Sequence, residues 1–476
     1  MADDVVLWRW DDLVATAAGT ADGPDAAPVT GFSIDTRTLA GGDVFVALAA
    51  ERDGHAFVPA AFVRGAAAAL VRRDYVRTPG DGALIRVDDP LLALECIGRA
   101  ARARLSSDAR VVAVTGSAGK TGTKEMLRAC LSRAGRVHAA EKSYNNHWGV
   151  PLTLARMPAA TRFAVLEIGM NHTGEITPLS QMVRPHVAVI TNVLPVHLGQ
   201  FASEAEIAQA KAEIFAGLEP GGTAVLNRDN PHFALLEARA GAHGARVHSF
   251  GTAAGSAIRA LSMDGGPAGT LVTLGFGCRT LRYTVGAPGA HLAVNSLAVA
   301  AVLDTLGLPL DSCLAALSEI AAPRGRGART TFPVPGGSLL LIDESYNANP
   351  ASMRAALAAM ATVPRHAFPR RIAVLGDMLE LGPHVAEFHR GLKAAVDAAG
   401  VDLVFACGPN MRLLFDDLAQ SQRAQWSEGS VGLAAGLARA LRPGDAVMIK
   451  GSLGTRMAPL VEAVTARFGG SEAKLG

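Results

Sequence analysis

Short, uninterrupted apolar runs alternate with longer stretches of helical periodicity through the middle of the chain. The runs cover residues 111–115, 163–168, 186–191 and 223–227. Continuous apolar runs are typical of parallel strands that helices cover on both faces, whereas a strand with one wet face alternates apolar and polar residues. The pattern therefore predicts a central α/β domain built on a mainly parallel sheet.

A second series of the same kind begins near residue 338. Its apolar runs are residues 338–343, 371–376, 401–408 and 445–451, and a helical stretch starts at Ala351. We expect a separate C-terminal α/β domain of the Rossmann-like type.

The remaining segments suggest where the domains divide. Residues 322–336 are dense in Gly, Pro and Arg and poor in apolar side chains, which is typical of a hinge or boundary. Shorter apolar runs at 43–49 and 83–87 indicate a small N-terminal α/β domain. The sequence thus predicts an α/β protein of three domains, at 1–108, 109–330 and 331–476, and a length of 476 residues fits about that number.

Composition and charge narrow the class of protein. Hydrophobic residues make up 49% of the chain and charged residues 18%, which excludes a disordered or fibrous protein. Lys and Arg total 45 against 43 Asp and Glu, so no strong field favours nucleic acid as a partner. The five cysteines form no close pair and the N-terminus lacks a signal-peptide pattern, which favours a cytoplasmic protein with reduced thiols.

One segment needs a test for membrane insertion. Residues 283–303 contain no Asp, Glu, Lys or Arg, and a span needs about 20 apolar residues. Gly286, Pro288 and Gly289 break the start of this segment, so only 290–303 is left to form a helix. We expect a buried helix and no membrane span.

The first apolar run leads into a glycine-rich loop and then a helical stretch. The loop consists of Gly116, Ser117, Ala118, Gly119, Lys120, Thr121 and Gly122. Backbone N–H groups of such a loop at a helix N-terminus can surround phosphate oxygens, with the lysine on the β and γ phosphates and the threonine hydroxyl on Mg²⁺. The usual first glycine is replaced by Val114, so the loop is a variant, but strand, loop and helix together predict ATP or GTP binding.

Polar residues near the ends of the other strands are candidates for the same site. Glu167 ends the run at 163–168, on the edge of the sheet where the loop also lies, so it can share a metal ion with Thr121. His197 follows the run at 186–191, although a lone loop histidine is more often a surface residue. Asn145 and Asn146 can equally be turn formers.

Lys211 has a similarly plain interpretation. Taken alone, it is most simply a solvated lysine in a helix that also carries Glu204, Glu206 and Glu213.

Several motifs together resemble the Mur ligase family, the ATP-dependent amino-acid ligases of peptidoglycan precursor synthesis. They are TGSAGKT, NNHWGVPLTL, LEIGMNHTGEI, AQAKAEIF, DESYNANPASM and LGDMLELG. The resemblance covers all three expected domains and is strongest to members that join D-alanyl-D-alanine to UDP-N-acetylmuramoyl-tripeptide through an acyl phosphate. It implies those two substrates, ATP and two Mg²⁺ ions, and we expect the chain to act as a monomer.

The resemblance also implies roles for individual residues. Lys120 and the loop would bind the ATP phosphates, Thr121 with Glu167 would hold one Mg²⁺, and His197 with Glu167 would hold the second. Lys211 matches a lysine that CO2 converts to a carbamate supporting the metal site. Asn146 would lie near the transferring phosphoryl group, although Asn145 is only one position away.

Further roles concern nucleotide and substrate. Asn295 matches a residue that contacts adenine, and Arg326 and Asp343 resemble a hinge arginine and a ribose-contacting aspartate. In SIDTRTLAGGDVFVAL, the residues expected to hold the UDP part of the substrate are Asp35, Thr36 and Arg37. The role of Lys450, in VMIKGSLGTRM, stays open.

Two alternatives remain from the sequence. One is another Mur-type ligase, adding a diamino acid to a UDP-muramyl dipeptide or glutamate to a folate. The diamino-acid ligases carry a DNPR-like motif that does not occur in this sequence. The other is a nucleotide-dependent binding module without ligase chemistry. The identity of the third peptide residue, diaminopimelate or lysine, cannot be predicted.

Overall fold

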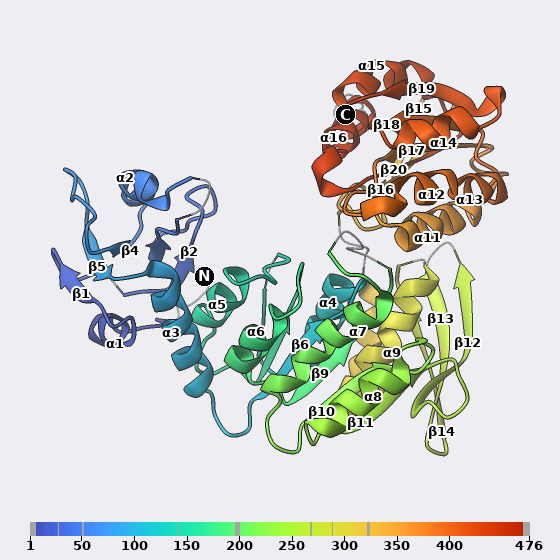
Figure 1. Ribbon diagram of the computed structural model, residues 1–476. Coiled ribbons are helices and arrows are strands. Elements are labelled where there is room, and N and C mark those ends of the chain that lie inside the picture. Colours follow the sequence, from blue (N-terminus) through green and yellow to red (C-terminus); the bar gives the residue numbers. More distant parts are fainter. Residues whose placement is uncertain are drawn as a thin grey trace.

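The computed structural model describes residues 6–26, 28–49, 52–140, 142–195, 200–266, 269–287, 289–320 and 324–469. Within these residues the strands form three sheets, which follow one another along the chain (Figure 1). The α/β class that the apolar runs predict is confirmed.

The N-terminal sheet has the strand order β1-β5-β4-β3-β2 in the described residues. Strands β2 to β5 run parallel, and β1 pairs antiparallel with β5. The elements are α1 (Trp10–Thr16), β1 (Thr20–Asp22), β2 (Gly31–Ser33), β3 (Asp43–Val46), η1 (Gly54–Phe57), α2 (Val58–Val63), β4 (Ala68–Arg72), β5 (Ala83–Val87) and α3 (Pro90–Ala103). Both predicted apolar runs of this domain contain a strand.

The central sheet has the order β14-β13-β12-β11-β10-β9-β6-β8-β7 in the described residues. Its first elements are β6 (Arg110–Thr115), α4 (Lys120–Leu131), β7 (Val137–Ala139), α5 (Gly149–Ala155), β8 (Phe163–Glu167), α6 (Ile176–Val183), β9 (Val187–Ile190), α7 (Glu204–Ala212), η2 (Glu213–Gly217) and β10 (Thr223–Asn227). The others are α8 (Phe233–Ala242), β11 (Arg246–Gly251), β12 (Ile258–Gly266), β13 (Gly269–Phe276), β14 (Arg279–Val285), α9 (Ala290–Thr305), α10 (Leu310–Leu314) and η3 (Ala315–Glu319).

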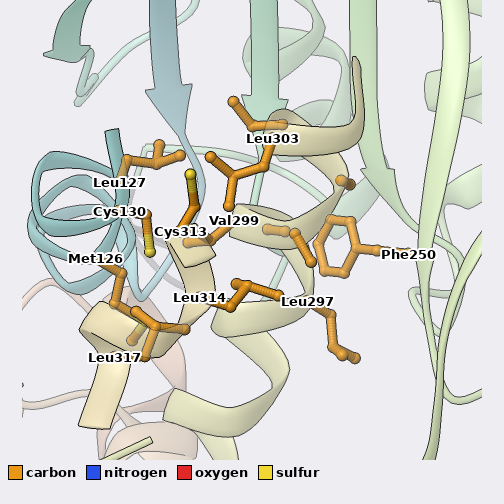
Figure 2. Close-up of a cluster of buried hydrophobic side chains, with 14 of the residues drawn as sticks. Met126, Leu127, Cys130, Phe250, Leu297, Val299, Leu303, Cys313, Leu314 and Leu317 are labelled. Atoms are coloured by element: carbon orange, nitrogen blue, oxygen red, sulfur yellow. The ribbon is translucent and has the colours of Figure 1, made fainter. Parts of the chain in front are cut away.

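Both faces of the central sheet are covered, as the continuous apolar runs predict. Val112 and Val114 of β6 pack with α4 and α9, and Val111 and Ala113 of the same strand pack with the helices of the opposite face. Figure 2 shows the first of these cores, where side chains of α4, α9 and α10 pack together beside Phe250 of β11. The predicted buried helix at 290–303 is α9, and no helix in the described residues is both long and apolar enough to cross a membrane.

The C-terminal sheet has the order β15-β16-β20-β17-β18-β19 in the described residues, parallel except for β15. Its elements up to β18 are β15 (Ala328–Val334), β16 (Gly337–Glu344), α11 (Pro350–Ala361), β17 (Arg370–Gly376), η4 (Gly382–His384), α12 (Val385–Arg390), α13 (Lys393–Ala398) and β18 (Leu403–Cys407). The rest are α14 (Met411–Asp417), η5 (Gln420–Gln422), β19 (Arg423–Ser427), α15 (Val431–Ala440), β20 (Asp445–Lys450), η6 (Leu453–Thr455) and α16 (Ala458–Phe468).

Part of the expected hinge is a strand. Within 322–336, β15 pairs antiparallel with β16 at the edge of the C-terminal sheet, and Pro333 is tolerated there because an edge strand has one unpaired side. The C-terminal sheet therefore starts at Ala328, slightly before the predicted boundary at 330. The three domain ranges themselves stay a prediction.

The domains meet at opposite ends of the central one (Figure 1). The N-terminal domain packs on α5 and α6 through α3 and β2. The C-terminal domain stands beyond the loops near α4 and α9, with α11 toward them. Any ligand held by two domains must therefore lie at one of these two junctions.

The cap of α3 offers a test of the N-terminal junction. Asp89 accepts hydrogen bonds from the N–H groups of Leu91 (2.7 Å) and Leu92 (3.3 Å) at the start of this helix. Because these donors have no partner within the helix, Asp89→Ala is expected to destabilise the protein by about 1 kcal/mol, measured by urea unfolding. Asp88→Ala is the control, since this highly exposed carboxylate makes only a surface ion pair with Arg73. Equal losses for both variants would contradict the role of the cap.

Candidate active site

The glycine-rich loop joins β6 to α4 as the sequence predicts. Gly119 immediately precedes the helix with a φ of 83°, in the left-handed region that favours glycine. A Cβ atom at Gly119 would also lie 2.5 Å from the side-chain amide nitrogen of Asn295, so that side chain would have to move. The loop is held from β9's side, where Asn192 Oδ1 accepts the N–H of Ala118 (2.9 Å). The loop thus has a fixed form at the positive end of a helix, which suits phosphate.

Lys120 bends back over this loop. Its ammonium donates to the carbonyl oxygen of Gly116 at 2.9 Å. Loss of solvent lowers the pKa of Lys120, the nearby charge of Arg326 lowers it further, and Glu167 opposes the shift. A phosphate oxygen entering the loop would restore a full counter-charge to this ammonium.

Oxygen ligands converge beside the lysine. Glu167, at the end of β8, is 2% exposed and accepts hydrogen bonds from Thr121 Oγ1 (2.9 Å) and Asn145 Nδ2 (2.8 Å). Ser143 Oγ lies 3.0 Å from the same threonine oxygen. Mg²⁺ prefers oxygen ligands and usually binds one or two carboxylates together with phosphate and water. Thr121 and Glu167 fit that need, although the described residues contain no cluster of three His, Cys, Asp or Glu side chains.

The two neighbouring asparagines have different contacts. Asn145 binds Glu167, whereas Asn146 Oδ1 accepts the N–H groups of Trp148 (3.3 Å) and Gly149 (2.9 Å) at the start of α5. Both line the cavity described below. The place of Asn146 near a transferring phosphoryl group stays a prediction.

Lys211 is not the solvated lysine that its helix suggests. It is 3% exposed on α7, and burial followed by the charge of Lys120 lowers its pKa well below the usual value. The neutral amine is therefore favoured far more than in an ordinary lysine. His197, which is expected to hold the second Mg²⁺ with Glu167, lies outside the described residues.

A cavity of about 730 Å³ lies between the central and C-terminal domains, and the glycine-rich loop forms part of its wall. It is lined by the predicted residues 117–122, Asn146, Glu167, Asn295 and Arg326 and by residues that the sequence did not single out, among them Ser143, His291, Glu344 and Tyr346. Lys450, whose role the sequence left open, also lines it. Its ammonium is buried and donates to Glu344 Oε2 and to the carbonyl of Asn347, both at 3.0 Å.

The residues expected at the hinge and at the ribose, Arg326 and Asp343, differ in their position relative to the cavity. Arg326 lies in the cavity wall with its guanidinium 4.2 Å from the centre of the Tyr346 ring. Asp343 is instead occupied by the chain, since its carboxylate accepts the N–H of Gly325 (2.8 Å) and the hydroxyl of Ser345 (2.6 Å). Asp343 is not among the described residues that line the cavity, so a ribose contact stays a prediction.

The expected UDP residues follow β2 in the N-terminal domain. Arg37 pairs with Asp35 through Nη2 and Oδ2 (2.7 Å), and its side chain is 84% exposed. This hydrogen bond is the main cause that lowers the pKa of Asp35. Asp35, Thr36 and Arg37 lie outside the nucleotide cavity, and their contact with a substrate stays a prediction.

Comparison with known proteins agrees with this geometry. The model of the "Mur ligase middle domain" matches residues 114–303, and that of the "Mur ligase, glutamate ligase domain" matches residues 333–453. The chain is 35% identical over 438 residues to the "UDP-N-acetylmuramoyl-tripeptide--D-alanyl-D-alanine ligase" of Synechocystis sp., covering 89% of each protein.

Solved structures agree as well. A crystal structure of MurF from Acinetobacter baumannii superposes with a TM-score of 0.82 at 28% identity, covering 97% of this chain and all of that one. A structure of the MurF ligase from Thermotoga maritima in complex with ADP reaches 0.75 at 25% identity, covering 92% and 98%. The chain therefore belongs to the Mur ligase family.

Proposed function

We propose that this protein joins D-alanyl-D-alanine to UDP-N-acetylmuramoyl-tripeptide with ATP, giving the UDP-muramyl-pentapeptide precursor of peptidoglycan, ADP and phosphate. The observation that carries the proposal is the 35% sequence identity to a ligase of that name, over an alignment that covers 89% of both chains. Convergence of the phosphate loop, Glu167 and residues of a second domain on one cavity supports it.

The chemistry needs activation of a carboxylate, because a carboxylate resists nucleophilic attack. In the proposed reaction, the terminal carboxylate of the tripeptide attacks the γ-phosphorus of ATP, the bond to the bridging oxygen breaks and ADP leaves. The amine of D-alanyl-D-alanine then forms a C–N bond with the acyl phosphate, phosphate leaves, and the amine loses a proton. Lys120 and the N–H groups of the loop stabilise the negative charge on the transferring phosphoryl group.

Metal binding is part of the proposal. Thr121 and Glu167 would hold one Mg²⁺, and Glu167 with His197 would hold a second. Bound Mg²⁺ neutralises charge between the two phosphate-bearing substrates. Lys211 is proposed to react as a neutral amine with CO2, because a carbamate would replace repulsion of the Lys120 ammonium by attraction.

The domains divide the substrates between them. The proposed UDP-muramyl domain is 1–108, the ATP domain 109–330 and the acceptor-side domain 331–476, with the nucleotide between the last two. Closure of these domains would exclude water, which hydrolyses acyl phosphates. A monomer in the cytoplasm stays a prediction, supported for the compartment by five free cysteines.

The test is phosphate release from Mg-ATP by the purified protein, with UDP-muramyl-tripeptide and D-alanyl-D-alanine added singly and together. Release that requires both substrates, with the pentapeptide product identified by mass, is expected. Release with another amino acid alone would indicate a different Mur-type ligase. Release without any acceptor would leave a nucleotide site but overturn the proposed substrates.

A further inference from the structure

Residues 142–146 cross the central domain with contacts toward each of its two junctions, and we call them the junction segment. Toward the central site, its Ser143 contacts Thr121 and its Asn145 binds Glu167. The carbonyl of Asn145 also accepts the N–H of Gly169 at 2.8 Å. The segment is thus fixed against both residues proposed to hold Mg²⁺.

The same segment reaches the N-terminal domain. Tyr144 packs against the hydrophobic cluster that the N-terminal domain forms together with α5. Arg156 lies beside the Tyr144 ring and donates to the carbonyl of Phe32 on β2 at 2.7 Å. After the hydrogen bond from Arg37, the charge of Lys142 is among the causes that lower the pKa of Asp35.

It also reaches the connection to the C-terminal domain. Arg326 Nη2 approaches Ser143 Oγ at 3.5 Å, while its guanidinium stacks on Tyr346 beyond β16. Ser143 therefore stands between the phosphate loop and the arginine that precedes the C-terminal sheet.

A fully buried lysine anchors this segment. Lys124 is 0% exposed on α4, one helical turn after Lys120. Its ammonium donates to the carbonyl of Ala140, lies 3.4 Å from that of Lys142, and pairs with Glu125 Oε1 at 2.8 Å. A buried ammonium is tolerated only where its donors are satisfied, so these carbonyls are held in place by it. Helix α4 thus carries both Lys120, which lies in the phosphate loop, and Lys124, which holds the start of the junction segment.

We propose that Lys124 is a positioning residue whose hold on the junction segment couples occupancy of the UDP-muramyl site to affinity at the nucleotide site. The inference rests on the proposed function, because it needs both substrates. Because Lys124 holds the segment firmly, a ligand that shifts it from the N-terminal side also shifts Ser143 and Asn145 against Thr121 and Glu167. By linkage, each ligand must then favour binding of the other.

The test replaces Lys124 with methionine, which keeps the aliphatic stem but removes the ammonium. Calorimetric titration measures the affinity of a non-hydrolysable ATP analogue with Mg²⁺, in the presence and absence of saturating UDP-muramyl-tripeptide. In the wild-type protein the UDP substrate is expected to tighten nucleotide binding by about fivefold or more. In Lys124→Met this factor is expected to approach one.

Glu125→Gln is the matched control, because it removes the ion pair while leaving the carbonyl contacts, and it should retain the coupling. A lower melting temperature for Lys124→Met with unchanged coupling would show a purely structural role and overturn the inference. If that variant does not fold, Ser143→Ala is titrated instead, and unchanged coupling there overturns the inference too. If the wild-type protein binds nucleotide but not the UDP substrate, the proposed function falls as well; if it forms product without coupling, only the inference falls.

Discussion

Lys120→Ala is expected to lower kcat for ADP formation by about a hundredfold to a thousandfold. The ammonium donates to the carbonyl of Gly116, which places it over the loop where phosphate would bind. Removing it leaves the loop N–H groups and the helix N-terminus to stabilise the transferring phosphoryl group alone. Initial rates of ADP release with both substrates present measure the effect.

The fold of this variant should persist. Lys120 is half-buried, and in the part of the chain that the structure describes its side chain makes one hydrogen bond, to Gly116, so thermal unfolding should change little. Lys393→Ala is the control, because this partly exposed helix lysine pairs with Asp397 and is not among the described residues that line the cavity, so kcat should stay unchanged. Lys120→Ala with wild-type turnover would overturn the assignment of the phosphate loop.

Sequence patterns predicted most of the strands whose burial is continuous, although the buried β4 of the N-terminal domain was not among them. The runs that became β6, β8, β9, β10, β16, β17, β18 and β20 are buried on both faces, and no tertiary knowledge is needed to recognise them. The antiparallel β12–β14 were not predicted. Along β12 buried and exposed residues alternate irregularly and Gly265 and Gly266 close it, so no continuous run marks it.

The site divides in the same way. The loop from Gly116 to Gly122 could be predicted, because its strand, glycines and helix are adjacent in the chain. Ser143 and Tyr346 could not be predicted, since Ser143 enters the cavity from a distant segment of the central domain and Tyr346 from the C-terminal domain. Asp343 shows the opposite effect, as its motif was found but its carboxylate is held by Gly325 and Ser345.

Lys211 is the clearest case in which tertiary structure reverses a local interpretation. Its helix also carries Glu204, Glu206 and Glu213, which favours solvation, yet folding buries the amine near Lys120. Two positive charges in a poorly solvated site destabilise each other. Burial of this amine near a second positive charge, which the sequence of the helix alone does not reveal, is the observation behind the carbamate proposal.

Lys211→Met is accordingly expected to lower activity by about tenfold to a hundredfold, the usual loss when a group supporting a metal site is removed. The carbamate proposal adds a sharper result. CO2 reacts with the neutral amine, and since burial lowers the pKa of Lys211, a larger share of this amine is neutral at a given pH than in an ordinary lysine. As pH falls through the lowered pKa, the amine protonates and the carbamate is lost.

Wild-type activity should therefore fall in CO2-depleted buffer, more steeply at lower pH, and recover when bicarbonate is added, whereas Lys211→Met should not respond to bicarbonate. Assays at fixed ionic strength separate this response from a salt effect. A wild-type enzyme indifferent to CO2 would exclude the carbamate while leaving a neutral lysine beside the site. A fully active Lys211→Met would exclude both roles, and the buried amine would then serve only the packing of α7.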